Sequence, residues 1–470
     1  MNFDTLNLPE PLTRALATAG YQQPTDVQAA AIPPALAGRD LMVASRTGSG
    51  KTASFMLPAL VRVLAARTQA AQAGQATPDP SAAARTPHSR PRRGAAGPHA
   101  HRPAHPLPAA RILVLAPTRE LAQQVAKAAQ DYGRYVPGLT VATLVGGVPY
   151  GGQLRALRGG ADIIVATPGR LLDHLGSGAA RLDHIQMLVL DEADRMLDMG
   201  FIDDIRRIAA ATPAARQTVM YSATFSGDAG RLAAELLRTP ARIEVASHTE
   251  AHADIEQRLH WADDFGHKHA LLEHILGERD LEQALVFTST QRDAEMLADR
   301  LADIGHSVQA LHGGMPQGQR NRVLQGLRNR HLRVLVATDV AARGLDVPTI
   351  SHVINFGLPM KEEDYVHRIG RTGRAGRAGL AVTLAERRDF GMIQRIQRFT
   401  TQRIPAATIA GLEPRRAEPR PLSRAGTAGK PPGRSAGKVP GKARDKAFGK
   451  PAGGLHSRSR GRDFESRGRG

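Results

Sequence analysis

One stretch of this 470-residue chain has the residue types of a phosphate-binding loop. SRTGSGKT (residues 45–52) follows the apolar run DLMVA (residues 40–44). Glycines let backbone N–H groups converge on phosphate oxygens, and a following helix adds its dipole. In such a loop Lys51 brings charge to the β and γ phosphates, and Thr52 offers a hydroxyl ligand to Mg²⁺. Ser45 stands where the strict pattern has its first glycine. A chance match in a flexible loop is the alternative interpretation.

A second stretch, MLVLDEADRMLDMGF (residues 187–201), places acids directly after an apolar run. Buried carboxylates are costly unless they have a partner. An acidic helix start, favoured by the helix dipole, is one interpretation of Asp191, Glu192 and Asp194. A phosphate loop suggests another, because a bound Mg²⁺–nucleotide needs a carboxylate at the end of a neighbouring strand. Asp191 would then hold the metal, and Glu192 would orient or deprotonate the attacking water.

The elements that position these residues are predicted from short apolar runs separated by stretches with helical spacing. Strands that alternate with helices indicate parallel sheets covered on both faces. The pattern weakens between residues 246 and 261 and then restarts. We therefore expect two α/β domains, residues 1–245 and 255–395, joined by a linker at residues 246–260. The strands are expected in these runs: 111–116, 141–145, 162–166, 188–190, 218–221, 284–287, 333–337 and 352–356.

Composition narrows the class of protein. Lys plus Arg number 63 against 44 Asp plus Glu, so the net charge is +19, which favours a polyanionic partner, nucleic acid before membrane. The chain has no cysteine, which excludes disulfides and thiolate metal sites. The N-terminal residues do not resemble a signal peptide, and no apolar run reaches about 18 residues. We expect a soluble, cytoplasmic protein.

Two segments carry most of the excess positive charge. Residues 66–109 contain six Arg and one Asp, and residues 413–470 contain 16 Lys/Arg and five Asp/Glu. Both are rich in small residues and proline and lack apolar periodicity, so we expect a disordered insertion and a disordered basic tail. The tail either adds RNA affinity or only improves solubility, and the role of the insertion is open.

A series of motifs resembles that of the DEAD-box RNA helicases, most closely the bacterial RhlE-like subgroup. The resemblance spans residues 3–377 and names a Q motif in residues 1–29. The motifs, in family order, are GYQQPTDVQ (20–28), SRTGSGKT (45–52), PTREL (117–121), GG (146–147), TPGR (167–170), DEAD (191–194), SAT (222–224), LVFTST (285–290), HGGMPQGQR (312–320), ATDVAARGLD (337–346) and YVHRIGRTGRAGR (365–377). The resemblance implies two RecA-like domains in tandem and an RNA-stimulated ATPase that unwinds short RNA duplexes locally and remodels RNA–protein complexes.

The resemblance also implies roles for particular residues in binding and hydrolysing ATP. Gln28 would read the adenine edge, Phe3 would stack on the base and Asp346 would contact the ribose. Arg371 and Arg374 would act as arginine fingers from the second domain. The implied nucleotide-binding residues are Phe3, Gln23, Gln28, Ser45, Arg46, Thr47, Gly48, Ser49, Gly50, Lys51, Thr52 and Asp346.

Further residues are implied in coupling hydrolysis to RNA. Asp194 would pair with His367 or with the SAT motif, whose Ser222 and Thr224 carry the coupling. The implied contacts to the RNA backbone are Thr118, Arg119, Gly147, Thr167, Arg170, Arg320 and Thr338. Contacts to sugar and phosphate carry no sequence information, so binding should tolerate many sequences.

Alternatives remain open at two levels. Thr25 and Gln28 have the spacing of a capping box, in which Gln28 stabilises a helix start without touching a ligand. At the level of the whole protein, an ATP-gated RNA clamp or an RNA chaperone acting through the tail would keep many of the same residues. A monomeric core is the default expectation.

Overall fold

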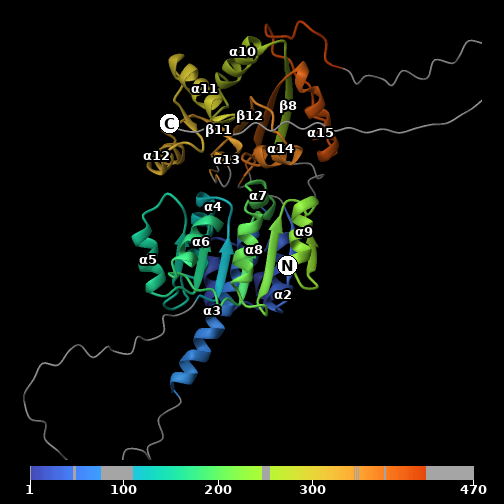
Figure 1. Ribbon diagram of the computed structural model, residues 1–470. Coiled ribbons are helices and arrows are strands. Elements are labelled where there is room, and N and C mark those ends of the chain that lie inside the picture. The colour runs from blue at the N-terminus through green and yellow to red at the C-terminus, as the bar shows by residue number, and fades with distance from the viewer. Residues whose placement is uncertain are drawn as a thin grey trace, which may run out of the picture. The chain divides into compact units, whose positions relative to one another are not determined.

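The computed structural model describes residues 2–45, 49–75, 110–245, 254–342, 345, 347, 349–374 and 377–419. These residues contain two parallel β-sheets (Figure 1). The first lobe (residues 2–245) contains β1 (Leu41–Ala44), β2 (Ile112–Leu115), β3 (Val141–Leu144), β4 (Ile163–Ala166), β5 (Met187–Leu190), β6 (Gln217–Ser222) and β7 (Ala241–Glu244). The second lobe (residues 254–419) contains β8 (Ile255–Ala262), β9 (Ala284–Thr288), β10 (Val308–Leu311), β11 (Val334–Thr338), β12 (His352–Asn355) and β13 (Gly379–Glu386). The expected fold class, two RecA-like α/β domains in tandem, is confirmed.

The strand order of the first sheet separates the motifs into two groups. The order is β3-β4-β2-β5-β6-β1-β7, and every pairing is parallel. The phosphate loop follows β1, the DEAD motif follows β5 and the SAT motif begins at the end of β6, so these three lie on adjacent strands. The PTREL, GG and TPGR motifs follow β2, β3 and β4. Because the carboxyl ends of parallel strands share one edge, all six motifs meet there.

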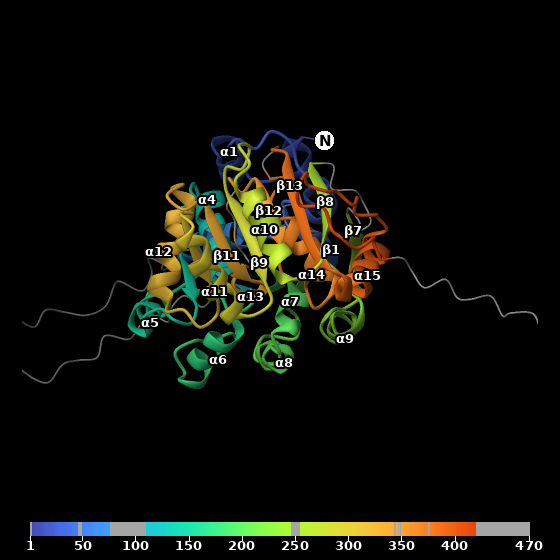
Figure 2. The same ribbon diagram turned by 90° about the horizontal axis from the view of Figure 1, so that it is seen from above.

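Helices cover both faces of the first sheet. Leu12, Ile32 and Phe55 belong to one buried cluster, while Leu171, Ile205 and Leu232 belong to the cluster on the other face. Figure 2 shows α1 on one side of this sheet and α8 and α9 on the other. The helices are η1 (Phe3–Leu6), α1 (Glu10–Thr18), α2 (Asp26–Leu36), α3 (Lys51–Gln75), α4 (Arg119–Tyr132), α5 (Tyr150–Arg158), α6 (Pro168–Gly176), α7 (Ala193–Asp198), α8 (Ile202–Ala210) and α9 (Gly227–Leu236).

The second sheet has the order β10-β11-β9-β12-β13-β8, again with parallel pairings. Its core also divides between two faces, with Leu272 and Leu297 on one and Leu324 and Val353 on the other. The helices are α10 (Phe265–Leu276), α11 (Gln291–Asp303), α12 (Gln317–Arg328), α13 (Asp339–Ala342), α14 (Glu362–Ile369), η3 (Arg387–Asp389) and α15 (Phe390–Thr400).

The expected domain limits need three corrections. Residues 255–260 are not linker, because β8 pairs with β13 along its whole length. The second lobe does not end at residue 395: α15 continues to Thr400, Ala406 bridges Leu259, and Leu412 packs on the core. The segment expected to be a disordered insertion from residue 66 begins inside α3, which runs to Gln75. Residues 76–109 and 420–470 lie outside the described residues.

Four strands were not anticipated as separate apolar runs. β7, β10 and β13 are short or interrupted by polar residues, and β8 reads IEQRLHWA, in which charged residues interrupt the apolar pattern. β7 and β8 pair with strands distant in sequence, β1 and β13, whereas the edge strand β10 pairs with the next strand in the chain, β11. No helix among the described residues is long and apolar enough to cross a membrane.

Candidate functional site

The phosphate loop is held between the end of β1 and the start of α3. Ser45 is 2% exposed, and its N–H donates to the Ser222 carbonyl at 3.0 Å, which ties the loop to β6. Lys51 begins α3, and its Nζ donates to the Ser45 carbonyl at 3.3 Å across the loop. Thr52 follows, half-buried, on the first turn. Arg46, Thr47 and Gly48 lie outside the described residues, so their expected contacts with phosphate stay predictions.

Gln28 both caps a helix and contacts the phosphate loop. Its Oε1 accepts the Thr25 N–H at 3.0 Å, which completes the capping box at the start of α2. Its Nε2 donates to the Gly50 carbonyl at 3.1 Å, and the side chain is 1% exposed. Gly50 has φ +91°, and a Cβ there would lie 2.5 Å from Gln28 Nε2. Gln28 therefore caps α2 and also hydrogen-bonds to the phosphate loop. Its contact with adenine stays a prediction.

The two other residues expected near the base, Gln23 and Phe3, do not contact the described residues of the phosphate loop as Gln28 does. Gln23 is exposed in the turn before α2. Phe3 is 5% exposed, belongs to the apolar core of the first lobe and meets the Tyr21 ring edge-on with centroids 6.1 Å apart. A ring packed in this way has little open face for a base. The structure thus gives Phe3 a packing role, and its stacking on adenine stays untested.

The acids after β5 occupy a buried, polarised site. Asp191 is 3% exposed and Glu192 is 7% exposed. Burial raises the pKa of Asp191 to about 6, the positive charge of Lys51 opposes that rise, and the charge of Glu192 adds to it. Glu192 has φ 50°, in the left-handed region that is sparsely populated for residues other than glycine. Such strain concentrates at functional sites.

The donor set at this site suits a hard divalent cation. Asp191 Oδ1 is buried and has no hydrogen-bond partner, so a carboxylate oxygen is available to a metal. Thr52 follows Lys51 at the start of α3 and offers a hydroxyl. Among the described residues, no three His, Asp or Glu side chains cluster as metal ligands. Mg²⁺ keeps several waters and shares phosphate oxygens, so a single carboxylate and a hydroxyl fit it.

Asp194 lies near both of its expected partners, His367 and the SAT motif. Its Oδ2 accepts the Ala223 N–H of the SAT motif at 3.1 Å and lies 3.9 Å from His367 Nε2 of α14. Burial raises the pKa of Asp194. Ser222 donates to the Thr224 carbonyl, so the SAT turn is closed on itself. The structure therefore brings the acid run, the SAT motif and the second lobe together at one carboxylate.

The two expected arginine fingers lie next to each other in the second lobe. Arg371 is 6% exposed; its Nε donates to the His367 carbonyl at 3.2 Å and its Nη1 to the Leu345 carbonyl at 2.9 Å. Arg374 Nη1 donates to the same Leu345 carbonyl at 3.3 Å. The expected ribose ligand, Asp346, follows Leu345 but lies outside the described residues. A third arginine of this motif, Arg368, pairs with Asp339 at 2.6 Å in the lobe interior.

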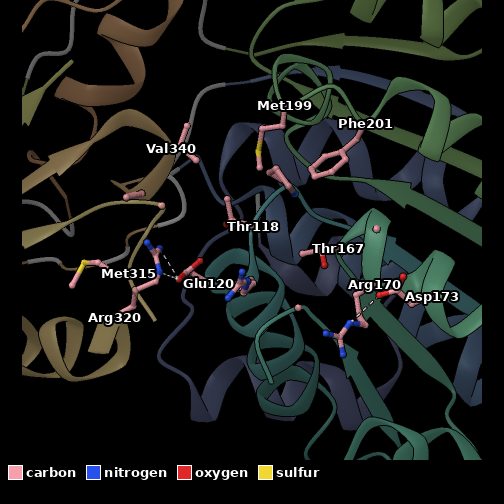
Figure 3. A pocket seen from close by; sticks show the side chains of 16 residues that line it. Thr118, Glu120, Thr167, Arg170, Asp173, Met199, Phe201, Met315, Arg320 and Val340 are labelled. Atoms are coloured by element: carbon pink, nitrogen blue, oxygen red, sulfur yellow. Dashed lines mark hydrogen bonds and ion pairs between the residues drawn. The ribbon is translucent and has the colours of Figure 1, made fainter. Parts of the chain in front are cut away.

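A cavity of about 370 Å³ collects most of the residues expected to contact RNA. Thr118 caps α4 and accepts the Leu121 N–H at 3.2 Å, and Arg170 lies 3.4 Å from Asp173 (Figure 3). Apolar side chains share the lining. The lining residues that were predicted from the sequence are Thr118, Arg119, Thr167, Arg170 and Arg320; those that were not include Glu120, Met199, Phe201, Met315 and Val340.

The remaining two expected RNA contacts do not line this cavity. Gly147 has φ 70°, which a side chain would strain, and a Cβ there would lie 2.2 Å from Arg119 Nη1, so that guanidinium would have to move. Thr338 ends β11 and is 8% exposed. Gly147 directly follows the lining residue Gly146, and Thr338 lies two residues before the lining residue Val340. Their contacts with RNA stay predictions.

Two polar contacts, one inside the cavity and one from its lining residue Arg119, join the lobes and were not anticipated. Arg320 Nη2 donates to Glu120 Oε1 at 2.8 Å, and Figure 3 shows the two side chains pointing toward each other. Arg119 Nη1 donates to Gln317 Oε1 at 2.5 Å. Glu120 is part of the PTREL motif but carried no assignment, because only the tertiary structure places an arginine of the other lobe beside it.

Comparison with known proteins identifies the family. The DEAD/DEAH box helicase family pattern matches residues 25–232, and that of the helicase conserved C-terminal domain matches residues 267–376. The chain is 38% identical over 418 residues to the ATP-dependent RNA helicase SrmB of Escherichia coli, covering 89% of this chain and 86% of that protein. It is 40% identical over 411 residues to the E. coli ATP-dependent RNA helicase DeaD, covering 87% of this chain but only 59% of that protein.

A solved structure agrees with these relatives. The structure of Dbp5 from Saccharomyces cerevisiae bound to RNA and ADP BeF3 matches with a TM-score of 0.70 and 28% identity, covering 86% of this chain and 95% of that one. The relatives include SrmB and DeaD and do not single out the RhlE-like subgroup. These matches agree with the two helicase domains, with the buried DEAD site beside the phosphate loop and with the cavity lined by residues of both lobes. The chain belongs to the DEAD-box family of ATP-dependent RNA helicases.

Proposed function

We propose that this protein hydrolyses ATP in response to single-stranded RNA and uses closure of its lobes to unwind short RNA duplexes locally, without long translocation, and so to remodel RNA–protein complexes. The observation that carries the proposal is the cavity of about 370 Å³, because Thr118 and Arg170 of the first lobe and Arg320 of the second line it together. An RNA strand in that cavity would favour the closed arrangement.

Hydrolysis would depend on residues of both lobes. Lys51 would bind the phosphates, and Glu192 would take a proton from the attacking water. Arg371 and Arg374 would stabilise charge in the transition state, an effect worth about 10³–10⁵ in rate for an arginine finger. Mg²⁺ held by Asp191 and Thr52 would neutralise phosphate charge. Because the arginines belong to the other lobe, hydrolysis would require closure, and RNA and ATP should bind cooperatively.

Recognition of RNA would be sequence-tolerant. The candidate residues are hydroxyls, arginines and a helix N-terminus, which are groups that contact sugar and phosphate. Discrimination against DNA would come from the 2′-hydroxyl. An ATP-gated RNA clamp is the second candidate, favoured by the same cavity, since holding RNA needs closure but not strand separation.

The test is the steady-state rate of phosphate release with and without single-stranded RNA, with a DNA strand of the same sequence as control. We expect strong stimulation by RNA, weak stimulation by DNA, and separation of a short duplex but not of a much longer one. Equal rates with and without RNA would contradict the coupling. Stimulated hydrolysis without any strand separation would favour the clamp.

A further inference from the structure

Charged side chains on α7 of the first lobe contact α14 of the second and Lys361 just before it. Arg195 Nη1 donates to Asp364 Oδ1 and also to Asp198 Oδ2, the latter at 3.3 Å. Lys361 Nζ donates to Asp198 Oδ1 at 2.5 Å. The side chains of Arg195 and Asp364 are only 4% and 9% exposed, whereas that of Lys361 is 58% exposed. We call the buried pair Arg195 and Asp364 the α7–α14 clamp.

The clamp lies beside the residues proposed to carry hydrolysis. α7 starts directly after Glu192, and Arg195 follows Asp194 in the chain. On α14, Asp364 comes one helical turn before His367, whose carbonyl accepts Arg371 Nε. The two helices thus meet at two neighbouring points. One is the approach of Asp194 to His367 at 3.9 Å, and the other is the pair of Arg195 with Asp364.

We propose that the α7–α14 clamp positions the arginine fingers, by setting the rotation of the second lobe relative to Glu192 when the lobes close. One contact between two helices leaves them free to pivot, whereas two contacts define the relative orientation of α7 and α14. The inference rests on the proposed function, since it assumes RNA-stimulated hydrolysis. Arg195 and Asp364 are positioning residues in this account, because they act through Glu192 and Arg371.

The energetics favour a role in orientation over a role in driving closure. Removing two charges from water costs about as much as their attraction returns, so a buried ion pair adds little net strength. It does penalise a misaligned approach, in which either charge would be buried without its partner. The exposed pair of Lys361 with Asp198 is screened by water and should contribute little.

The first measurement compares Asp364→Asn with Lys361→Met in RNA-stimulated ATPase assays. We expect Asp364→Asn to lower kcat at least about tenfold at saturating RNA and ATP, because a small misplacement of catalytic groups is costly. KM for ATP should stay within about threefold, since the phosphate loop belongs to the first lobe. Lys361→Met should change kcat less than about threefold. Glu235→Gln, which breaks the exposed Arg206–Glu235 pair inside the first lobe, is the matched control.

A second measurement separates closure from orientation. The chain has no cysteine, so fluorophores can be attached at Ala211→Cys and Met296→Cys, one exposed position on each lobe. With RNA and a non-hydrolysable ATP analogue, energy transfer in the labelled wild-type background should show one closed state. Asp364→Asn should still close but with a broader or shifted distribution. An unchanged distribution together with an unchanged kcat would overturn the proposal.

A double variant controls for the effect of an unpaired buried charge. Asp364→Asn leaves Arg195 partly uncompensated, which can lower Tm without any role in orientation. Arg195→Met combined with Asp364→Leu removes both charges and should restore Tm, while kcat stays low because apolar side chains impose no directional contact. If kcat returns with Tm, the orientation role is wrong. If the wild type itself lacks RNA stimulation, it is the proposed function that fails.

Discussion

Glu192 holds an unusual backbone conformation for its residue type. Its φ of 50° and ψ of 55° place it in the left-handed region at the start of α7, a conformation that costs on the order of 1–3 kcal/mol. The cost is tolerated because Asp191 and Ala193 on either side are fully packed, at 3% and 0% exposure. The conformation turns the chain sharply between β5 and α7, so that Asp191 ends the strand and Glu192 begins the turn.

Glu192→Gln tests the proposed base directly. The amide keeps the shape of the side chain but cannot accept a proton, so RNA-stimulated kcat should fall by about 10²–10⁴. ATP binding should persist because Lys51 and the loop are untouched. Phosphate release and binding of a fluorescent ATP analogue measure the two effects. Retained turnover in Glu192→Gln would exclude Glu192 as the base.

Gln28→Glu separates the two roles of Gln28. The carboxylate keeps an acceptor for the Thr25 N–H, so the capping box should be preserved, while the cost of burying its charge should lower Tm. It loses the Nε2 donor to the Gly50 carbonyl, and the loss of one hydrogen bond near a charged ligand should raise KM for ATP by up to about tenfold. An unchanged KM would instead assign Gln28 to the cap alone.

Individual elements of the second lobe carry buried histidines that make its stability depend on pH. Burial lowers the pKa of His352 on β12 and of His260 on β8. The neutral form is favoured in the folded state, so both contributions are fully present above the ordinary pKa of 6.5. They are lost as pH falls below that value toward the folded pKa.

His352→Gln should flatten this dependence. The amide cannot titrate, so the free energy of unfolding should fall less steeply below pH 6.5, by up to about 1.4 kcal/mol per pH unit. Trp261 is the only tryptophan and lies in the core of the second lobe, so its fluorescence reports unfolding of that lobe in urea. His331→Gln, at an exposed position, serves as control. If the free energy of unfolding falls equally steeply with pH in wild type and in His352→Gln, His352 does not cause the pH dependence.

At the scale of the whole molecule, charge is concentrated outside the described lobes. Residues 420–470 contain 14 Lys/Arg and three Asp/Glu. The boundary matters, because the backbone N–H groups of Arg415 and Arg416 donate to Asp263 and so belong to the second lobe. A truncation at residue 413 would therefore damage the lobe as well as remove the basic segment.

Removing residues 420–470 should weaken RNA binding most at low salt. Each lost phosphate contact should make the slope of log affinity against log salt shallower by about 0.7. Tm and kcat at saturating RNA should not change. Fluorescence anisotropy over a salt series measures the slope, and removal of residues 413–470 is the comparison expected to lower Tm. An unchanged slope would favour a solubilising role for the segment.

Local sequence was sufficient to predict the phosphate loop, the acid run and most strands. Residues 45–52 and 187–201 predicted a phosphate loop and an acid run on separate strands, because glycine spacing and apolar runs are local properties. The strands in residues 111–116, 284–287 and 333–337 were found for the same reason. β8 and β10 were not, since polar residues interrupt their apolar pattern and their hydrogen bonds come from neighbouring strands, β13 and β11.

Contacts between distant residues needed the tertiary structure. Glu120 and Asp364 are ordinary acids in sequence, and only the folded chain places Arg320 and Arg195 of opposite lobes beside them. Gln28 could cap a helix or serve the nucleotide site, and the fold lets it cap α2 and contact Gly50 at once. The types and spacing of residues therefore indicated the family and a set of candidate groups for ATP and RNA, whose roles stay predictions. Which charges meet across the lobes depended on packing, because a charge acquires its partner only when the chain is folded.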